Sequence, residues 1–294
     1  MNDFDEIVKK KLTDPQIQNE KDYWNELREI TQNIILSGLR KTDFFDNAVF
    51  MGGTALRLIY GLNRYSEDLD FNFINNSPDF SWEKYYNDIK KHGEIFGYNF
   101  TFKNESYDNR KTKSVLIRDE SLGIKIKEMN IVNVDFTKKM AGNYRKIKIS
   151  LDGSYQAGNF VFEEKNMGFP DKYNLKVFDL KSLYGGKLHA ILTRKDKHGN
   201  DVDEGRDWFD LGWFIKQNIN PNYDYLFDKL QAHQNFREKG VIRTNDWLKE
   251  QLLKRAEKLN FEKLNDDIFQ ITTNNNYIEL DLEKVKGFIE KAGI

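Results

Sequence analysis

Cysteine is absent from the chain, which excludes disulfide bonds and thiolate chemistry. Long apolar runs are absent as well, because no segment approaches the roughly 18 consecutive apolar residues that cross a bilayer. Residues 1–6 are acidic and lack the apolar core of a signal peptide. We therefore expect a soluble, cytoplasmic protein with no membrane partner.

A strong charge of one sign is also missing. The 46 basic and 47 acidic residues leave a formal net charge of −1, which provides no global attraction to nucleic acid. Segment 138–148 is a local exception, because it is basic and contains no acid. It is interpreted either as a solvated hairpin or as a contact for a phosphate backbone. Its charged side chains are Lys138, Lys139, Arg145, Lys146 and Lys148.

Histidines in metal-ligand spacing are absent too. His189 is interpreted as a structural residue, and the others are His92, His198 and His233. What the chain does contain is a large apolar and aromatic content, with 39% hydrophobic residues and 22 Phe, 14 Tyr and 5 Trp. This composition argues against disorder, and 294 residues can form one large or two small domains with a core.

The hydrophobic pattern predicts an α+β fold. Its first part alternates helices with short strands, and punctuation by Asn and Gly between the later strands suggests antiparallel hairpins. Helices are expected at 21–40, from Thr54 and at 80–96, and strands at 48–51, 68–73, 98–102, 115–117, 124–126, 132–136, 147–151 and 160–162.

The remainder of the chain is predicted to be mostly helical. Apolar residues recur at helical spacing in 179–194, 206–216, 222–235 and 245–258. A change of composition at 165–175 places the domain boundary, so we predict domains at 1–165 and 166–294. The fold class is therefore a mixed sheet with flanking helices, followed by a mostly helical C-terminal part.

Two adjacent glycines, Gly52 and Gly53, separate the predicted strand 48–51 from the helix that follows. Glycine allows turns that are closed to other residues and lets the backbone approach a ligand closely. The N-terminus of the helix adds free N–H groups and a partial positive charge, which suit a phosphate. Together with the hydroxyl of Thr54, this segment predicts a phosphate-binding turn.

Asp68 and Asp70 alternate with two apolar residues, Leu69 and Phe71. In a strand, residues two apart point to the same face, so both carboxylates are expected side by side. Neighbouring carboxylates repel each other unless a cation lies between them, and hard oxygen ligands suit magnesium. The pair predicts a magnesium site beside the phosphate-binding turn.

Lys187 falls within the apolar stripe of the predicted helix 179–194. An ammonium group facing the core is costly unless it is paired or reaches water. In one interpretation, the aliphatic part of the side chain packs in the core while the ammonium group reaches water. In the other, the ammonium group binds a phosphate or a carboxylate. Asp207 and Asp210 share one face of the next helix, and Arg206 with Asp207 could form a structural ion pair instead.

The motifs together resemble the nucleotidyltransferase superfamily of DNA polymerase beta, and more specifically the AbiEii toxin family. The resemblance covers about residues 40–216 and rests on 52–58, Arg64, Ser66, 68–71, 183–194 and 206–211. It implies that Gly52, Gly53 and Thr54 hold a triphosphate, and that Asp68 and Asp70 bind one or two Mg²⁺ ions. It further implies that Lys187 grips the nucleotide phosphates. Asp210, with Asp207 as second choice, would position Lys187 or the acceptor.

One departure from the family concerns a third carboxylate on a later strand. The strand expected to carry it, 146–150, has Lys148 where an acid should stand. Asp135, which alternates with apolar neighbours, is an alternative, and Asp152 is a weaker one because it follows the predicted strand end. Without a third carboxylate, Asp210 would be the base, or the acceptor would arrive already activated.

The resemblance implies a toxin that transfers a nucleoside monophosphate (NMP) from a nucleoside triphosphate (NTP) to RNA. The expected acceptor is the 3′ end of tRNA, and a cognate antitoxin is expected, with direct binding left open. Two alternatives remain at this point. One is transfer to a small-molecule hydroxyl, as in antibiotic-modifying relatives, and the other is an NTP-binding protein without transfer chemistry.

Overall fold

The computed structural model describes residues 3–106, 112–119, 121, 146–156, 158–232 and 244–291. The chain forms two compact units, each described here by itself. The first, the sheet unit, comprises Met1–Ile59, Tyr65–Gln156 and Glu164–Val177. The second, the helical unit, comprises Tyr60–Arg64, Ala157–Glu163 and Phe178–Ile294. Among the described helices, none is long and apolar enough to span a membrane.

The sheet unit is built on a mixed sheet of seven strands in the order β3-β4-β5-β2-β1-β7-β6. Antiparallel pairs join β3 to β4, β4 to β5 and β1 to β2, while β2 to β5 and β1 to β7 are parallel. The strands are β1 (Ala48–Met51), β2 (Leu69–Phe73), β3 (Phe100–Asn104), β4 (Thr112–Asp119), β5 (Ile147–Ser154), β6 (Phe162–Met167) and β7 (Tyr173–Phe178). Residues 162, 163 and 178, at the outer ends of β6 and β7, belong to the helical unit.

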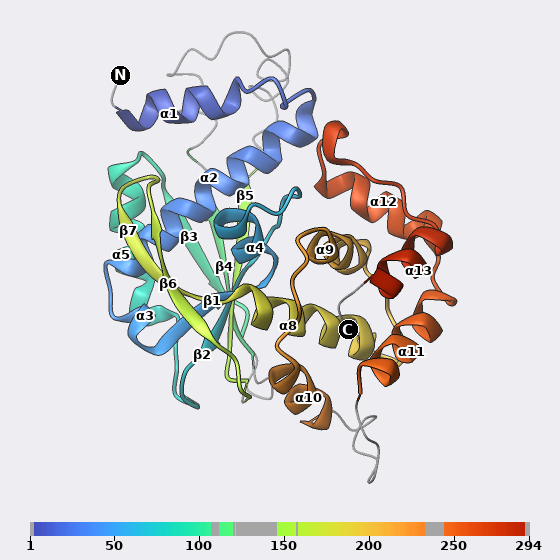
Figure 1. Cartoon of the computed structure of the whole chain (residues 1–294). Helices are drawn as coiled ribbons and strands as arrows, with labels where there is room; N and C mark the ends of the chain where they lie inside the picture. Colours follow the sequence, from blue (N-terminus) through green and yellow to red (C-terminus); the bar gives the residue numbers. More distant parts are fainter. Residues whose placement is uncertain are drawn as a thin grey trace. The chain divides into compact units, whose positions relative to one another are not determined.

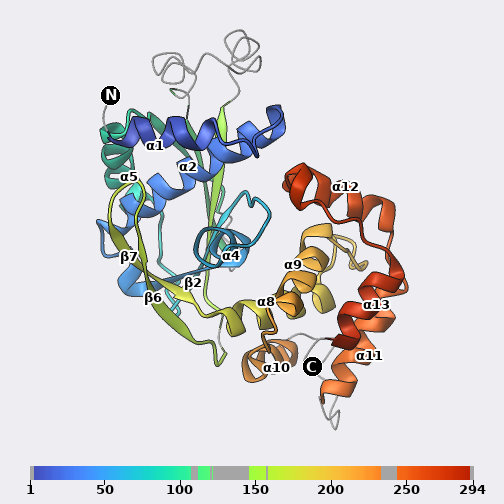
Figure 2. The same cartoon turned by 45° about the horizontal axis from the view of Figure 1, so that its top comes forward.

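Five helices accompany this sheet. The longest, α2, packs against α1, α5 and β5, and Figures 1 and 2 show it beside α1. Its N-cap Asn19 accepts a hydrogen bond from the backbone N–H of Asp22, which satisfies one free donor of the first turn. The helices are α1 (Asp3–Leu12), α2 (Glu20–Arg40), α3 (Phe44–Asn47), α4 (Gly52–Tyr60) and α5 (Glu83–Ile95).

An aromatic cluster forms the core between α3, the sheet and the start of α5. The Phe44 ring lies 4.8 Å from Phe71 and 5.3 Å from Trp82, measured between centroids, and all three side chains are almost fully buried. The indole N–H of Trp82 donates to the carbonyl of Lys113 at 2.7 Å, so its polar atom is satisfied. This core fixes the strand that carries Asp70.

The helical unit contains six helices in its described part, with short loops between several of them. Helix α8 packs against α9, α10 and α11, and α9 also packs against α12 and α13 (Figures 1 and 2). Tyr184 and Phe214 stack with ring centroids 4.4 Å apart at the α8–α9 contact. The helices are α8 (Leu180–Thr193), α9 (Gly205–Lys216), α10 (Tyr223–Ala232), α11 (Asn245–Ala256), α12 (Phe261–Ile271) and α13 (Leu282–Lys291).

The predicted fold class is confirmed, with differences in detail. Segment 165–175, the predicted domain boundary, contains the end of β6 and the start of β7. The compact units also interleave along the chain, whereas domains 1–165 and 166–294 remain a prediction. The strands predicted at 124–126 and 132–136 lie outside the described residues, as do Lys138, Lys139 and Arg145.

Candidate active site

Gly52 lies where β1 ends and α4 begins, two residues earlier than the predicted helix start. Its φ of +83° is a backbone conformation that side-chain-bearing residues rarely adopt. A Cβ atom here would lie 2.2 Å from Oδ2 of Asp70, which stands on β2 opposite Met51. The glycine therefore serves a second purpose that the sequence did not indicate, because it leaves room for the Asp70 carboxylate.

The position of Asp152 differs from the predicted one. Strand β5 continues to Ser154, so Asp152 lies within it and not beyond its end. The parallel register pairs Asp152 directly with Asp70, and register partners in a sheet point to the same face. Both carboxylates are half-buried. The sheet thus supplies a second strand-borne acid beside Asp70, while Asp135 lies outside the described residues.

Two hydroxyl groups orient the Asp152 carboxylate. Ser150 Oγ donates to its Oδ2 at 3.1 Å, and Ser114 Oγ on β4 donates to its Oδ1. Ser150 lies on the strand that was expected to carry the third carboxylate. Lys148, which stands at the position expected for that acid, is exposed. Hydrogen bonds donated to both oxygens hold a carboxylate in one orientation.

Asp68 is half-buried in the loop just before β2. Side chains of two helices donate hydrogen bonds to the backbone carbonyls of this loop. Gln32 on α2 donates through Nε2 to the carbonyls of Ser66 and Glu67, each at 2.9 Å. The hydroxyl of Thr54 on α4 donates to the carbonyl of Asp68. Three consecutive carbonyls therefore have side-chain donors, and the loop that presents Asp68 is fixed by two helices.

This contact changes the interpretation of Thr54. The side chain was expected to offer its hydroxyl to a triphosphate, yet Thr54 has 0% exposure and its hydroxyl bonds to the protein backbone. Its hydroxyl hydrogen is therefore donated to the Asp68 loop, and contact of Thr54 with a triphosphate stays a prediction. The backbone N–H groups of the first turn of α4 remain the donors that the glycine-rich turn can offer.

A partly buried ionic layer joins α4 to α2. Arg57 Nε lies 2.7 Å from Glu29 Oε2, and Lys11 Nζ lies 2.9 Å from Glu26 Oε1. Burial, together with the neighbouring Glu29, raises the pKa of Glu26. Arg57 also lies over the ring of Tyr65, 4.6 Å from its centroid. The layer anchors the helix whose N-terminus forms the glycine turn.

In the sheet unit the donor set is made of hard oxygen atoms, which suit Mg²⁺. Among the residues that the structure describes, no three His, Asp or Glu side chains form a group ready to hold a metal ion. Mg²⁺ is commonly bound by one or two carboxylates plus phosphates of the substrate. Asp68 and Asp70 fit that pattern.

The helical unit holds the second group of predicted residues. Lys187 on α8 lies with Nζ 3.0 Å from Oδ1 of Asp207 and 2.7 Å from Oδ2 of Asp210. Both acids come from α9, where their i,i+3 spacing places them on one face, as predicted. The Lys187 side chain retains 14% exposure. The ammonium group is therefore paired with two carboxylates, and the side chain remains partly exposed.

Both carboxylate oxygens of Asp210 form ion pairs. Arg64 grips it with two bonds, Nε to Oδ1 at 2.6 Å and Nη2 to Oδ2 at 2.7 Å. Exposure of the Arg64 and Asp210 side chains is 1% and 0%, respectively. A bidentate pair of this kind is strong and geometrically specific. Of the two roles predicted for Asp210, positioning Lys187 matches these contacts, whereas meeting an acceptor does not.

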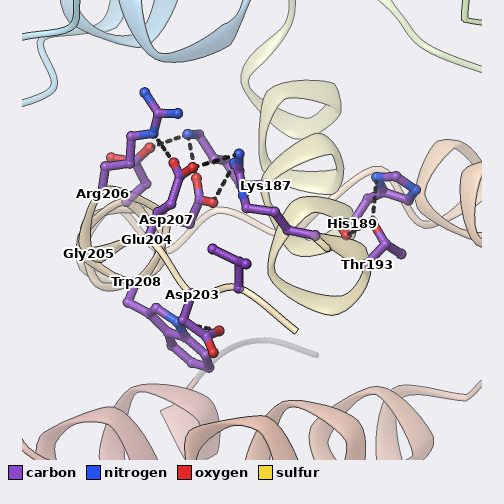
Figure 3. A network of polar contacts seen from close by, with 12 residues as sticks. Lys187, His189, Thr193, Asp203, Glu204, Gly205, Arg206, Asp207 and Trp208 are labelled. Carbon is purple, nitrogen blue, oxygen red and sulfur yellow. Dashed lines mark hydrogen bonds and ion pairs between the residues drawn. The ribbon is translucent and has the colours of Figure 1, made fainter. Parts of the chain in front are cut away.

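Asp207 lies between two cations. Besides Lys187, it contacts Arg194, whose Nη2 lies 2.7 Å from its Oδ2. Burial acts to raise the pKa of Asp207, but Lys187 and Arg194 outweigh it, so the pKa falls to about 2. Arg206 pairs with Glu204 (Figure 3), and its charge also helps to lower the pKa of Asp207. Asp207 therefore remains charged and holds Lys187.

These groups form one alternating chain of charges. In order it runs Arg64, Asp210, Lys187, Asp207, Arg194, Glu204 and Arg206. With four cations and three carboxylates, the chain carries one positive charge in excess. An ammonium group has three N–H donors, and in the described part of the chain two carboxylates contact Lys187. The ammonium group thus has one N–H more than it has carboxylate partners in this network.

Sequence reasoning missed Arg64, Arg194 and Gln32 as parts of the site. Two of these had a signal, because Arg64 and Arg194 stand inside the motif strings that carry the family resemblance. Gln32 had none, since it lies on a helix outside both motifs. His189, interpreted as structural, lies with Nδ1 3.4 Å from the hydroxyl of Thr193 (Figure 3).

The chain is similar to known proteins in sequence and in structure. The family model described as "Nucleotidyl transferase AbiEii toxin, Type IV TA system" matches residues 34–284. The nucleotidyltransferase toxin MenT4 from Mycobacterium tuberculosis H37Rv has a similar structure, with 16% identity, 97% of this chain and 89% of that chain covered, and a TM-score of 0.59. JHP933 from Helicobacter pylori has 18% identity, covers 90% and 88%, and gives a TM-score of 0.49. No curated protein matches the chain.

Proposed function

Because the chain belongs to the AbiEii family of nucleotidyl transferase toxins of type IV toxin–antitoxin systems, we propose that it transfers NMP from an NTP to RNA. We expect the 3′ end of tRNA to be the acceptor. Membership in this family implies a nucleotide substrate and a cognate antitoxin. The observation that carries the proposal is the register of Asp70 and Asp152 on neighbouring strands, next to the glycine turn.

The triphosphate would bind at the N-terminus of α4. Gly52 and Gly53 begin this helix, so their backbone N–H groups have no partner within it. The helix dipole adds a partial positive charge at the same place. The proposed role of Thr54 is indirect, since its hydroxyl holds the Asp68 loop.

Asp68 and Asp70 would hold one or two Mg²⁺ ions together with the substrate phosphates. When bound, Mg²⁺ neutralises phosphate charge, makes the α-phosphorus more electrophilic and stabilises the departing pyrophosphate. Gly52 keeps the Asp70 carboxylate from being displaced by a side chain at the turn. Gln32 and Thr54 keep Asp68 in place through its loop.

Asp152 would act as the general base. It accepts the proton of the attacking acceptor hydroxyl, whose oxygen then bonds to the α-phosphorus while the bond to pyrophosphate breaks. The support for this role is the position of Asp152 opposite Asp70 and the two serine hydroxyls that orient its carboxylate. This proposal replaces Asp210 as base, because Asp210 is fully buried against Arg64.

Lys187 would bind the phosphates of the nucleotide. Its support is the remaining N–H donor, the 14% exposure of its side chain and the excess positive charge of its network. Asp207 and Asp210 hold the ammonium group so that little side-chain entropy is lost when it meets a phosphate. These two acids are positioning residues in this account.

The test uses purified full-length protein, Mg²⁺, total tRNA and each NTP labelled at the α-phosphate. We expect label on tRNA with the wild type, and a loss of at least about 100-fold in Asp70→Ala and Lys187→Ala. The matched controls are Asp79→Ala and Lys181→Ala, which change exposed residues of the same types on the same units. Intact NTP binding with no labelled RNA would contradict RNA transfer. Label on a small molecule would support the antibiotic-modifying alternative.

A further inference from the structure

The helical unit contains a cavity that the proposed reaction does not use. Its volume is about 310 Å³, within the range of small-molecule pockets, which begins at roughly 300 Å³. Its walls come from α9, from the segment that follows α4, from residues 275–280 and from α13. Lys187, Asp207 and Asp210 are not among the lining residues.

Three aromatic rings line this cavity. Phe209 and Trp213 come from α9 with 6% and 8% exposure, and Phe288 comes from α13. Gly212 lies between them, and a Cβ atom there would stand 2.7 Å from the ring of Phe288. The absence of a side chain at Gly212 therefore lets that ring approach α9. Such a wall suits a flat, apolar-faced ligand.

The polar part of the lining consists mainly of amides. Asn63, Gln217 and Asn275 contribute exposed side chains, and in the described part of the chain none of these three side-chain amides has a hydrogen-bond partner. An amide both donates and accepts, which matches the alternating donors and acceptors on the edge of a nucleobase. Among the lining residues Lys216 is the one with a charged side chain, and no carboxylate is present to attract a cationic ligand.

We propose that this cavity binds a nucleobase, with its face against the aromatic rings and its edge against the amides. Lys216 would then contact a phosphate attached to the same nucleoside. The base could come from a free nucleotide or from an unstacked base of RNA, since both present the same chemistry. The proposal does not depend on the transfer reaction, because the cavity and the reaction use different residues.

Binding is tested on the full-length protein without Mg²⁺, by equilibrium dialysis with four labelled nucleosides. We expect at least one nucleoside to bind, and the double variant Asn63→Leu with Gln217→Leu to weaken it about tenfold. Asn75→Leu is the matched control, an exposed asparagine of the sheet unit, and should bind like the wild type. Circular dichroism and thermal unfolding check that each variant is folded.

A second readout places the ligand in the cavity. Stacking on Trp213 should quench tryptophan fluorescence, and Trp213→Phe should remove this quench while dialysis still detects binding. Asp70→Ala should bind nucleosides normally. If nucleoside binding is lost in Asp70→Ala and retained in the cavity variants, it belongs to the transfer site and the proposal is wrong.

Competition experiments separate the two sources of the base. A single-stranded RNA trinucleotide that competes more strongly than a nucleoside supports an RNA base, and the reverse supports a free nucleotide. Ribose 5-phosphate should not compete. The proposal is overturned if ribose 5-phosphate competes as well as nucleosides, or if no nucleoside binds at concentrations of about 10 mM.

Discussion

At the scale of single residues, Gly52 is the clearest case of a sequence motif with two physical reasons. One is its φ of +83°, and the other is the Asp70 carboxylate, which occupies the space that a Cβ would need. The motif was predicted from the first reason alone. The second depends on β2 pairing beside β1, which a local pattern does not reveal.

Gly52→Ala should therefore lower transfer activity, in addition to the stability lost through backbone strain. Gly199 provides a matched control, because its φ is +84° and nothing lies within 4 Å of its Cβ position. We expect Gly199→Ala to lose about 1 kcal/mol of stability and keep transfer activity. Gly52→Ala should lose at least about 100-fold in transfer, because Asp70 must move. Equal activity in the two variants would contradict the role assigned to Gly52.

The pKa of Asp207 leads to a prediction about acid stability. Its folded value of about 2 lies below the ordinary 3.8, so the residue stabilises the fold above the unfolded pKa, and this is lost as the pH falls through about 2. The free energy of unfolding of Asp207→Asn should be lower than that of the wild type at pH 7. The gap should narrow by about 2 kcal/mol between pH 5 and pH 2.

Denaturant unfolding at several pH values measures this gap. Asp79→Asn, which changes an exposed acid, serves as the comparison and should show a small and constant gap. If the gap for Asp207→Asn did not change with pH, Lys187 and Arg194 would not be its charge partners in solution.

Asp152 gives a prediction that separates binding from chemistry. We expect Asp152→Asn to lower the rate of transfer by about 10²- to 10⁴-fold, because an amide cannot accept the acceptor proton. NTP affinity should change much less. Single-turnover kinetics with a separate NTP-binding measurement test this, and a lost NTP affinity with an unchanged rate would assign Asp152 to binding.

At the scale of elements, the loop that presents Asp68 before β2 is held in place by side chains of the neighbouring helices α2 and α4. Gln32 of α2 and Thr54 of α4 together hold the carbonyls of Ser66, Glu67 and Asp68. Groups that orient metal ligands change metal affinity by about 10- to 100-fold when they are removed. Gln32 and Thr54 are therefore positioning residues for Asp68.

Gln32→Leu should raise the Mg²⁺ concentration for half-maximal transfer by about tenfold, with a smaller effect at saturating Mg²⁺. Thr54→Val should act in the same direction, and Thr54→Ser, which keeps the hydroxyl, should restore the wild-type requirement. Gln16→Leu alters an exposed glutamine near the start of α2 and is the control. An unchanged Mg²⁺ requirement in Gln32→Leu would contradict the positioning role.

Elements with strong local patterns were the predictable ones. The spacing of apolar residues indicated α2, β1, α8 and α9 with ends close to those observed, because each follows one helical or strand period. The end of β5 was mispredicted, since Asp152 and Gly153 disfavour a strand by propensity. Neighbours on both sides, β2 and β4, keep these residues in the sheet.

Long-range pairs were beyond the reach of the sequence pattern. Arg64 and Asp210 are 146 positions apart, and Asp70 meets Asp152 through a parallel pairing of distant strands. Neither pairing leaves a periodic trace in the chain. The local motifs thus named Asp70 and Lys187 as candidate site residues, whereas the residues that contact them became visible only in the fold.

At the scale of the whole molecule, each unit carries residues that we propose to take part in transfer. The sheet unit carries the glycine turn and three acids, Asp68, Asp70 and Asp152, and the helical unit carries Lys187 within its network of charges. Variants in each unit should therefore abolish transfer, although the helical-unit cavity should still bind nucleosides in Asp70→Ala.

The central claim is that the chain adds NMP to RNA, and the most direct test is the intact mass of tRNA after incubation with NTP and Mg²⁺. We predict that wild-type protein raises the mass of tRNA by whole nucleotide units at the 3′ end. Asp70→Ala and Lys187→Ala should leave the mass unchanged, and Asp79→Ala should match the wild type. Unmodified tRNA after complete incubation with NTP-binding wild-type protein would contradict tRNA as the acceptor.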